Sequence, residues 1–402
     1  MRSLYTVALR LALPLILLRL WWRGRREPGY RAHVQERFGF YSGERPDKAL
    51  WVHAVSVGEA RAAAPLVREL KRLYPDHTVV MTCTTAAGRD TVKQVYGESV
   101  LAAYLPYDYP EPVQSFLERF RPRLGVLMET ELWPNLLARC ERNGVPVALA
   151  NARMSEKSAR GYRRLRSLAE PALRSLAVVC AQSEADAARL RELGARRVEV
   201  TGNLKFDVTL DGAQLEAGRE WKARLGRQVV LLASTRDGEE KLLLETKTTA
   251  LVVVVPRHPQ RFDEVAALAD NRRTRAPFPA PQDRVYLGDT MGEMAFYYAA
   301  CDVAVIGGSF MPLGGQNLIE ALAAGTPVVL GPSMYNFAEA TRLALEAGAA
   351  LQAADAREAM LRANELLGDP ARREALAGAG KRLYEVHHNA TARHLRLLRQ
   401  LA

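Results

Sequence analysis

The fold class is decided by two neighbouring stretches, VAVIGGSF at residues 303–310 and GGQNLIEALAAGTP at residues 314–327. They predict a buried strand, a glycine-rich turn and a short helix that ends at a glycine before a proline. Bare N–H groups in such a turn, at the start of a helix, suit a phosphate or carboxylate. Glu320 lies three residues after Asn317, so both side chains can face one ligand. The stretch therefore favours nucleotide or nucleotide-sugar binding over a plain strand-to-helix turn in an α/β core.

Outward from this stretch, apolar strand-like runs alternate with helical stretches from residue 50 onward. The predicted strands are 51–55, 78–83, 124–128, 145–150, 178–182, 229–233, 251–255, 285–287, 303–306 and 328–330, with helices such as 59–73 and 88–96 between them. This alternation indicates parallel sheets covered by helices on both faces. Turn and charged residues dominate 201–226, which predicts a linker. The expected fold is therefore α/β, with two Rossmann-like domains facing a central cleft and ligands outside the carboxyl ends of the strands.

Composition limits the partners. The chain has 402 residues and a formal net charge of +11, carried by scattered arginines rather than one basic tract. Such a charge favours anionic partners. Nucleic acid is not expected, because no standard nucleic-acid-binding signature is present. The four cysteines lie far apart, and the seven histidines form no metal-binding motif, so no protein-bound metal is expected.

The N-terminal run LYTVALRLALPLILLRLWW at residues 4–22 predicts attachment to a membrane. Its uninterrupted apolar core, 11–18, is too short to cross a bilayer of about 30 Å. The whole run can just span if Arg10 and Arg19 reach the interface, or it can lie flat as an interfacial anchor. Three arginines directly after the run place the rest of the chain on the cytoplasmic side. The alternative is a helix packed on the protein's own surface.

Acidic and basic side chains follow several predicted strands of the first half. Glu59, in SVGE, can act as a general base or simply stabilise a helix start. The segment METELWPN places Glu129 and Glu131 after another strand, and one of these acids is expected to serve catalysis. Arg153 and Lys205 can each meet an anionic group of a substrate, although a surface lysine is the alternative for Lys205.

The second half carries its own candidates at strand ends. Arg257 lies in PRHP, where two prolines fix its position for phosphate or base contacts. A turn rich in hydroxyl groups spans 233–239, and Met291-Gly292-Glu293 begins a predicted helix. Each signal is weak alone. Together with Asn317 to Glu320, they put several contacts on one rim of one domain.

These motifs, in this order, resemble those of the bacterial 3-deoxy-D-manno-octulosonic acid (Kdo) transferases. The resemblance rests on SVGE, METELWPN, NARMS, TGNLKFD, PRHP and GGQNLIE and runs from the N-terminal run to beyond residue 340. It implies a GT-B fold and an inverting transfer of Kdo from CMP-Kdo to the lipid A precursor lipid IVA. It also implies action at the cytoplasmic face of the inner membrane, without a metal or other cofactor.

The resemblance also implies roles for particular residues. Glu59 matches the general base, and Glu129 and Lys205 match residues that support the transition state. The segments that match CMP-binding residues are Pro256-Arg257, Met291-Gly292-Glu293 and Asn317-Leu318-Ile319-Glu320. The corresponding domains are an anchor at 1–26, an acceptor domain at 27–210 and a donor domain at 211–402, with the last helical stretch crossing back to the first domain.

Two alternatives stay open at this point. The chain can be another GT-B transferase that uses a UDP-sugar on a lipid acceptor, or a non-catalytic protein that binds lipid or nucleotide. One segment departs from the family pattern, because only about ten residues, 241–250, are left for a helix and its exit turn. The number of Kdo residues added, the acceptor's acyl pattern and the oligomeric state are not encoded in any motif of the sequence.

Overall fold

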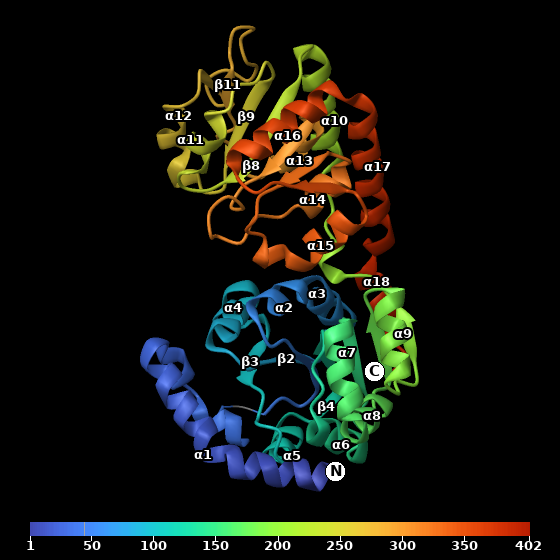
Figure 1. The fold of residues 1–402 in the computed structure, drawn as a ribbon. Coiled ribbons are helices and arrows are strands. Elements are labelled where there is room, and N and C mark those ends of the chain that lie inside the picture. The colour runs from blue at the N-terminus through green and yellow to red at the C-terminus, as the bar shows by residue number, and fades with distance from the viewer. Residues whose placement is uncertain (44) are drawn as a thin grey trace. The chain divides into compact units, whose positions relative to one another are not determined.

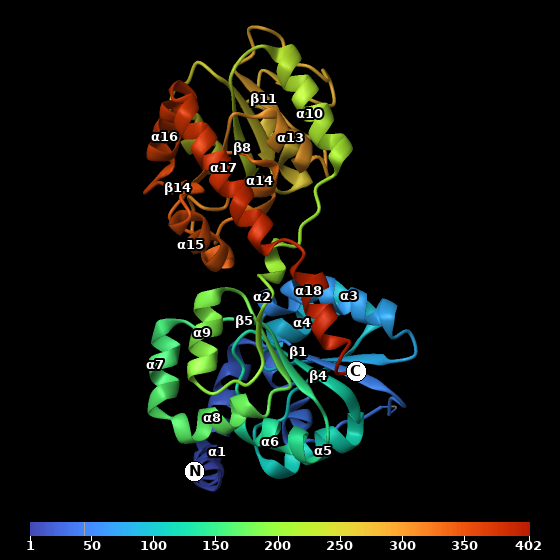
Figure 2. The same ribbon diagram turned by 90° about the vertical axis from the view of Figure 1, so that its right-hand side faces the viewer.

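The chain forms two compact units, each built on its own parallel sheet. The computed structural model describes residues 1–43 and 45–402, with only the backbone at Arg26 and Pro28. Unit 1 comprises 1–207 and 389–402, and unit 2 comprises 208–388. In Figures 1 and 2, helices cover both faces of each sheet. The predicted α/β class with two Rossmann-like sheets is confirmed.

Unit 1 contains a seven-stranded sheet in the order β3-β2-β1-β4-β5-β6-β7, with every pair parallel. Its strands are β1 (Ala49–His53), β2 (Thr78–Cys83), β3 (Leu101–Tyr104), β4 (Pro122–Met128), β5 (Val147–Ala152), β6 (Val178–Ala181) and β7 (Val198–Val200). Its helices are α1 (Arg2–Arg26), α2 (Val57–Ala62), α3 (Ala64–Leu73), α4 (Ala86–Tyr96), α5 (Pro110–Phe120), α6 (Pro134–Arg142), α7 (Glu156–Arg164), α8 (Arg166–Arg174), α9 (Glu184–Glu192) and α18 (Ala390–Leu398), with short 3-10 turns such as η1 (Pro28–Tyr30) and η4 (Leu204–Phe206).

Unit 2 has a second seven-stranded sheet in the order β10-β11-β9-β8-β12-β13-β14, again parallel. Its strands are β8 (Val229–Thr235), β9 (Leu251–Pro256), β10 (Asn271–Arg272), β11 (Val285–Leu287), β12 (Val303–Ile306), β13 (Val328–Leu330) and β14 (Ala350–Gln352). Its helices are α10 (Gly212–Leu225), α11 (Glu239–Leu244), α12 (Phe262–Ala266), α13 (Met294–Ala300), α14 (Ile319–Ala324), α15 (Ala338–Glu346), α16 (Ala356–Gly368) and α17 (Pro370–His387).

The pleat of the central strands builds a core on each face of a sheet. In β1, Ala49 and Trp51 belong to one buried cluster, whereas Leu50 and Val52 belong to another. Alternate side chains of a strand point to opposite faces, so an almost wholly apolar strand serves both layers. This explains why unbroken apolar runs marked the central strands in the sequence.

Three features of the fold correct the sequence reading. The predicted linker at 201–226 contains a 14-residue helix, α10, which Asp211 caps and Gly226 ends. The helix predicted at 59–73 is two helices, α2 and α3, separated at Ala63. The last helical stretch is also divided, into α17 and α18, because Asn389 takes a left-handed conformation with φ 61°. After this break, α18 packs in unit 1, beside α3 (Figure 2).

The short segment 241–250 holds a complete connection. Helix α11 ends at Leu244, and Leu243 is fully buried in the core of unit 2. The backbone N–H of Ala250 donates to the Thr248 hydroxyl at 3.2 Å just before β9 begins. One and a half turns of helix are therefore enough to join β8 to β9 here.

Candidate active site

Acidic side chains gather in unit 1 where the strand order of the sheet reverses. Strands β1 and β4 are neighbours there, although their next partners lie on opposite sides. This reversal is where ligands bind in open α/β sheets. A cavity of about 180 Å³ lies at this edge, and it is lined by Glu59, Glu129, Thr130, Glu131, Arg153, Ser155 and Ser158. The structure thus brings together the acids that follow β1 and β4 and the arginine that follows β5.

Glu59 is held by the start of its own helix. The Ser56 hydroxyl donates to Glu59 Oε1 at 2.9 Å, and the Glu59 N–H donates back to that hydroxyl oxygen at 3.3 Å. The Val55 N–H donates to Glu59 Oε2 at 2.8 Å. This arrangement resembles a capping box, except that the carboxylate accepts from the N–H of Val55, one residue before the cap residue Ser56. The two sequence readings of Glu59, an acid at a helix start and a general base, are thus compatible in one side chain. The cap fixes a carboxylate that is only 8% exposed at the wall of the cavity.

Two opposing effects set the proton affinity of Glu59. Burial, and then the nearby charge of Glu129, raise the pKa of Glu59 to about 7, although the Val55 N–H, the Ser56 hydroxyl and Lys205 favour the ionised form. A carboxylate with such a pKa can accept a proton near neutral pH. Burial and the charge of Glu59 likewise raise the pKa of Glu131 to about 7. Sequence reasoning left Glu129 and Glu131 equal, and both line the cavity.

Glu129 and Lys205 face each other across this edge. Glu129 directly follows β4, and its backbone is left-handed, with φ 59°. Residues other than glycine adopt this conformation at an energetic cost. The Nζ of Lys205 lies 3.9 Å from Glu129 Oε1, and both side chains are about one-quarter exposed. Lys205 is therefore no isolated surface lysine, which was the alternative considered from the sequence.

A chain of buried amide groups holds Lys205 close to Glu129. It follows β7, at the edge of the sheet, whereas Glu129 follows a central strand. The Asn151 Oδ1 accepts from the Leu204 N–H at 3.0 Å, and Gln182 Nε2 donates to the Asn151 carbonyl at 2.8 Å. Asn203 Nδ2 donates to Gln182 Oε1 at 2.9 Å. These bonds fold the segment before Lys205 back over the ends of β6 and β5.

The C-terminal helix supplies the last member of this chain. His394 in α18 is fully buried, and its Nε2 accepts from the Asn151 N–H at 2.9 Å. Its Nδ1 lies 2.7 Å from the Ala390 carbonyl oxygen, so Nδ1 carries the proton. Burial lowers the pKa of His394 to about 4, which keeps the ring neutral. The sequence offered no signal for this contact, because the two residues are 243 positions apart.

The candidates of unit 2 follow neighbouring strands of the second sheet. Arg257 comes directly after β9 and is exposed, while Pro256 is the buried last residue of that strand. Glu320 lies in the first turn of α14, after β12, and accepts from Asn317 Nδ2 at 2.9 Å. Burial raises the pKa of Glu320, and the Asn317 amide and the Arg257 guanidinium oppose this shift. The charges of Arg257 and Glu320 are thus close enough to interact.

The remaining predicted nucleotide contacts differ in what they can offer. The side chains of Leu318 and Ile319 are buried in the core, so only their backbone is open to a ligand. Met291 is 58% exposed. Glu293 accepts from the Arg273 guanidinium at 2.7 and 2.9 Å. Burial favours the protonated form of Glu293, but hydrogen bonds from Arg273 and Thr290 outweigh it and lower the pKa of Glu293.

The glycine turn itself corrects the sequence reading. Its N–H groups are not bare, because the carboxylate of Glu239 already occupies them. Glu239 is fully buried, and it accepts from the N–H groups of Gly308 at 2.6 Å, Phe310 at 2.9 Å and Arg236 at 2.8 Å. Buried N–H groups need an acceptor, and here the chain provides one. The predicted anion site exists, but its anion is part of the protein.

Comparison with known proteins identifies the family. A family model described as 3-Deoxy-D-manno-octulosonic-acid transferase (kdotransferase) matches residues 32–208. The 3-deoxy-D-manno-octulosonic acid transferase of Bordetella pertussis is 47% identical, over 98% of both chains. The corresponding transferase of Haemophilus influenzae is 34% identical, over 99% of this chain and 98% of that one. The chain belongs to the Kdo transferase family.

The fold of this Kdo transferase family member agrees with a solved structure. MurG of Acinetobacter baumannii superposes with a TM-score of 0.55 at 13% identity, over 88% of this chain and all of that one. The GT-B fold predicted for the chain is confirmed, and the chain is a glycosyltransferase. In this family member, three features escaped sequence reasoning: the role of Glu239, the buried amide chain and the contact of His394. Each is a buried polar side chain whose partner is distant in sequence or is a backbone group.

Proposed function

We propose that this glycosyltransferase moves Kdo from CMP-Kdo to the lipid A precursor lipid IVA, with inversion, in lipopolysaccharide core biosynthesis. Family membership supports the sugar and the reaction class. The observation that carries the proposal is the carboxylate of Glu59, which is fixed by hydrogen bonds from Val55 and Ser56 and has a pKa of about 7. A non-catalytic binding protein has no need for such a base.

In the proposed reaction, a hydroxyl group of lipid IVA binds in the cavity of unit 1. Glu59 accepts the hydroxyl proton while the oxygen attacks the anomeric carbon of Kdo. The new bond forms on the face opposite the bond that breaks, and CMP leaves with the electron pair. Glu129 and Lys205 orient the reacting groups and stabilise the transition state through their charges. Arg153 lines the same cavity, and we assign it a contact with a phosphate of the acceptor.

Unit 2 is the proposed donor unit. Arg257 stabilises the negative charge that develops on the CMP phosphate, and the first turn of α14 adds backbone N–H groups. Glu320 is placed to accept hydrogen bonds from the ribose hydroxyls, and Asn317 orients it at 2.9 Å. Pro256, Met291, Gly292 and Glu293 complete the proposed nucleotide site. No contact is assigned to the glycine turn, because Glu239 fills it.

We also propose that the reaction needs no metal or other cofactor, since arginine and lysine side chains can neutralise the leaving phosphate. Transfer should therefore continue at an unchanged rate in excess EDTA. A rate that falls with EDTA and returns with added Mg²⁺ would contradict this part of the proposal.

The proposed site of action is the cytoplasmic face of the inner membrane. The helix α1 is the structural support, because residues 2–25 are long and apolar enough to cross a membrane, and only 6% of their most apolar window is buried. The net charge of +11 favours an anionic surface.

The deciding experiment offers the purified chain lipid IVA with CMP-Kdo, and in parallel with UDP-sugars. We expect the mass of the lipid to increase by one or more Kdo units with CMP-Kdo alone. Transfer only from a UDP-sugar would overturn the donor assignment. The Glu59→Gln variant should bind CMP with unchanged affinity and lose at least about a hundredfold in transfer, the low end of general-base contributions. Native transfer by this variant would remove Glu59 from the mechanism.

A further inference from the structure

Helix α1 presents an apolar stripe on the side that faces away from the rest of unit 1. The stripe residues recur every three or four positions, which places them on one side of a helix. They are between 52% and 77% exposed: Leu4, Val7, Leu11, Leu15, Leu18 and Trp22. Exposed apolar residues are ordinary when scattered, but a continuous stripe marks an interaction surface.

The opposite side of α1 is also apolar and is already covered. The partly buried residues of the helix recur with the same spacing and include Tyr5, Leu9, Leu13, Ile16 and Leu20. A surface helix that covers its protein normally has a polar outer face. In α1 both faces are apolar, so the outer face calls for a second apolar partner.

The first half of α1 is joined to unit 1 by specific contacts. Asn135 Nδ2 donates to the Thr6 hydroxyl at 3.0 Å, and the Tyr109 hydroxyl donates to the Leu9 carbonyl at 2.8 Å. Asn135 is in turn fixed at the start of α6, where its N–H donates to the buried Asp108 at 3.0 Å. It lies four residues after Glu131, so this contact reaches the segment that lines the cavity.

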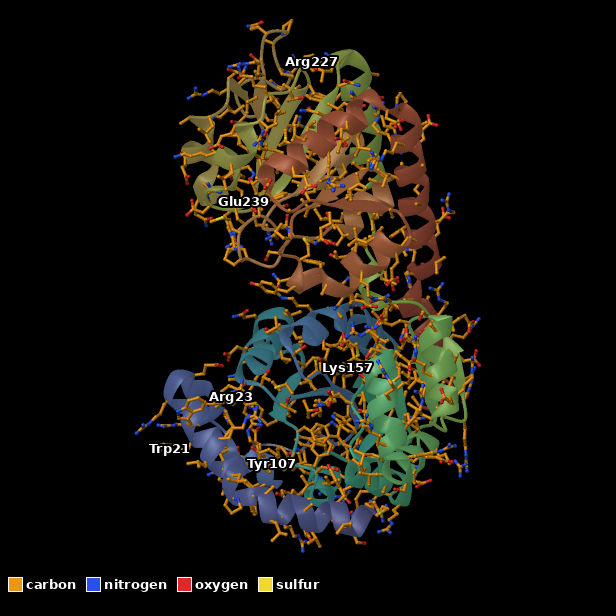
Figure 3. The ribbon with its side chains drawn as sticks, in the orientation of Figure 1. Trp21, Arg23, Tyr107, Lys157, Arg227 and Glu239 are labelled. Carbon is orange, nitrogen blue, oxygen red and sulfur yellow. The ribbon has the colours of Figure 1, made fainter. Side chains whose placement is uncertain are left out.

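The second half of α1 contacts the segment of unit 1 that directly follows it. The guanidinium of Arg31 donates to the Trp21 carbonyl at 3.2 Å, and Arg23 lies 4.7 Å above the ring of Tyr30. Figure 1 shows α1 running along the outside of unit 1, and Figure 3 shows Trp21 and Arg23 near its C-terminal end. A helix that crossed the bilayer away from unit 1 would have to give up the contacts of at least one half.

We propose that α1 lies flat in the surface of an anionic bilayer and does not cross it. The stripe enters the acyl boundary, while the contacts to unit 1 stay intact on the other side. The exposed arginines Arg19 and Arg25 reach the anionic lipid headgroups, whereas Arg10 stays paired with Glu111 at 2.6 Å. This inference rests on the proposed membrane location and not on the transfer reaction.

The first test asks on which side each end of α1 lies. Single cysteines are introduced as Ser3→Cys or Arg25→Cys in a Cys301→Ser background, because the other three cysteines are buried. An impermeant maleimide is then applied to spheroplasts and to inverted membrane vesicles. We expect both sites to react only in inverted vesicles, which expose the cytoplasmic side. Reaction of Ser3→Cys in spheroplasts would show a crossing helix and overturn the proposal.

The second test removes the stripe without touching the inner face. The double variant Leu11→Asp/Leu15→Asp should bind vesicles of phosphatidylethanolamine and phosphatidylglycerol at least about tenfold more weakly in flotation assays. The matched control is Leu361→Asp, which changes a leucine of α16 that is 45% exposed, and it should bind as the wild type does. Unchanged binding by the double variant would overturn the proposal. So would a wild-type dimer that the double variant dissociates, because the stripe would then bind a second copy.

Transfer to detergent-dispersed lipid IVA separates this inference from the proposed reaction. The double variant should retain wild-type transfer in detergent, since the stripe contacts no residue of the cavity. If no transfer occurs even with the wild type, the proposed reaction fails while the labelling and flotation results still decide how α1 lies.

Discussion

In the proposed mechanism, Glu59 has two tasks that make different demands on one carboxylate. As a helix cap it accepts hydrogen bonds from Val55 and Ser56, and as a base it must take up a proton. Each carboxylate oxygen has two lone pairs, so both tasks fit one side chain. The cap holds the carboxylate in place, and burial raises its pKa to the range where proton transfer is useful. The structural role and the proposed catalytic role are therefore compatible at this residue.

The pH dependence of transfer should report the ionisation of Glu59. Only the ionised form can accept a proton, so kcat/KM should rise with pH and level off above about 7. Lys205 favours the ionised form, and Lys205→Met should therefore move this limb to higher pH besides lowering the rate. Lys93→Met, at an exposed position of α4, should leave the limb in place. A limb that stays fixed in Lys205→Met would show that another group titrates.

Glu239 is expected to act as a positioning residue, and a single substitution tests this. An amide at this position turns one acceptor into a donor that faces backbone N–H groups. Glu239→Gln should lower the free energy of unfolding by about 2 kcal/mol, the cost of a buried polar group without its partner. It should also weaken CMP binding, because the glycine turn leads into the segment with Asn317 and Glu320. Urea denaturation and calorimetric CMP titration measure both effects, and Glu245→Gln, at an exposed position just after α11, serves as the control.

At the scale of elements, the C-terminal helix α18 completes the site of unit 1. His394 brings an acceptor to Asn151, and Asn151 holds the segment that carries Lys205. The geometry of the candidate site in unit 1 thus depends on residues from the far end of the sequence. Loss of α18 would remove the acceptor of the Asn151 N–H, although α18 supplies no residue that lines the cavity.

The buried imidazole of His394 predicts a pH effect on stability. Its pKa is about 4 in the folded chain and about 6.5 when unfolded, so the unfolded chain binds more protons between these values. The stabilisation by the neutral ring is complete above about 6.5 and is lost as pH falls toward 4. Between pH 7 and pH 5 the loss should be about 2 kcal/mol.

Variants at position 394 isolate this effect from other buried groups. His394→Gln keeps an acceptor for the Asn151 N–H but cannot titrate, so it should lack this part of the pH dependence while staying folded at pH 7. His394→Leu should lose about 1–3 kcal/mol at both pH values, because the Asn151 N–H is left without an acceptor. Equal pH dependence in wild type and His394→Gln, measured by urea denaturation, would contradict the assignment.

The sequence predicted elements best where burial dominates. The apolar runs of β2, β11, β12 and β13 marked these strands to the residue. The edge strands β7 and β14 did not stand out, because each has only one buried residue. Helix α10 was read as a linker because only Gly218 and Trp221 of its 14 residues are buried, so it lacks a clear apolar face. In the site, strand ends located Glu59, Glu129 and Lys205. Their supporting contacts depend on tertiary packing and could not be read from local patterns.

At the scale of the whole molecule, the positive charge and the apolar stripe make separable contributions to membrane binding. The net charge of +11 attracts anionic lipid over a distance that salt shortens. Binding to phosphatidylglycerol vesicles should therefore weaken from about 50 mM to about 500 mM NaCl, yet a salt-resistant part should remain. Flotation of the wild type beside Leu11→Asp/Leu15→Asp measures this: the variant should lose the resistant part and keep the salt-dependent one. Complete release of the wild type by salt would show that charge alone holds it.

The buried contact between Glu239 and the glycine turn also has an evolutionary consequence. A change at position 239 alone leaves three N–H groups without their acceptor, those of Arg236, Gly308 and Phe310. A side chain added at Gly308, whose φ is 68°, would meet Gln316 at 3.0 Å. Neither position can change first without loss. Among descendants of this sequence the two should vary together, and a lineage that loses the acid should also have remodelled the turn.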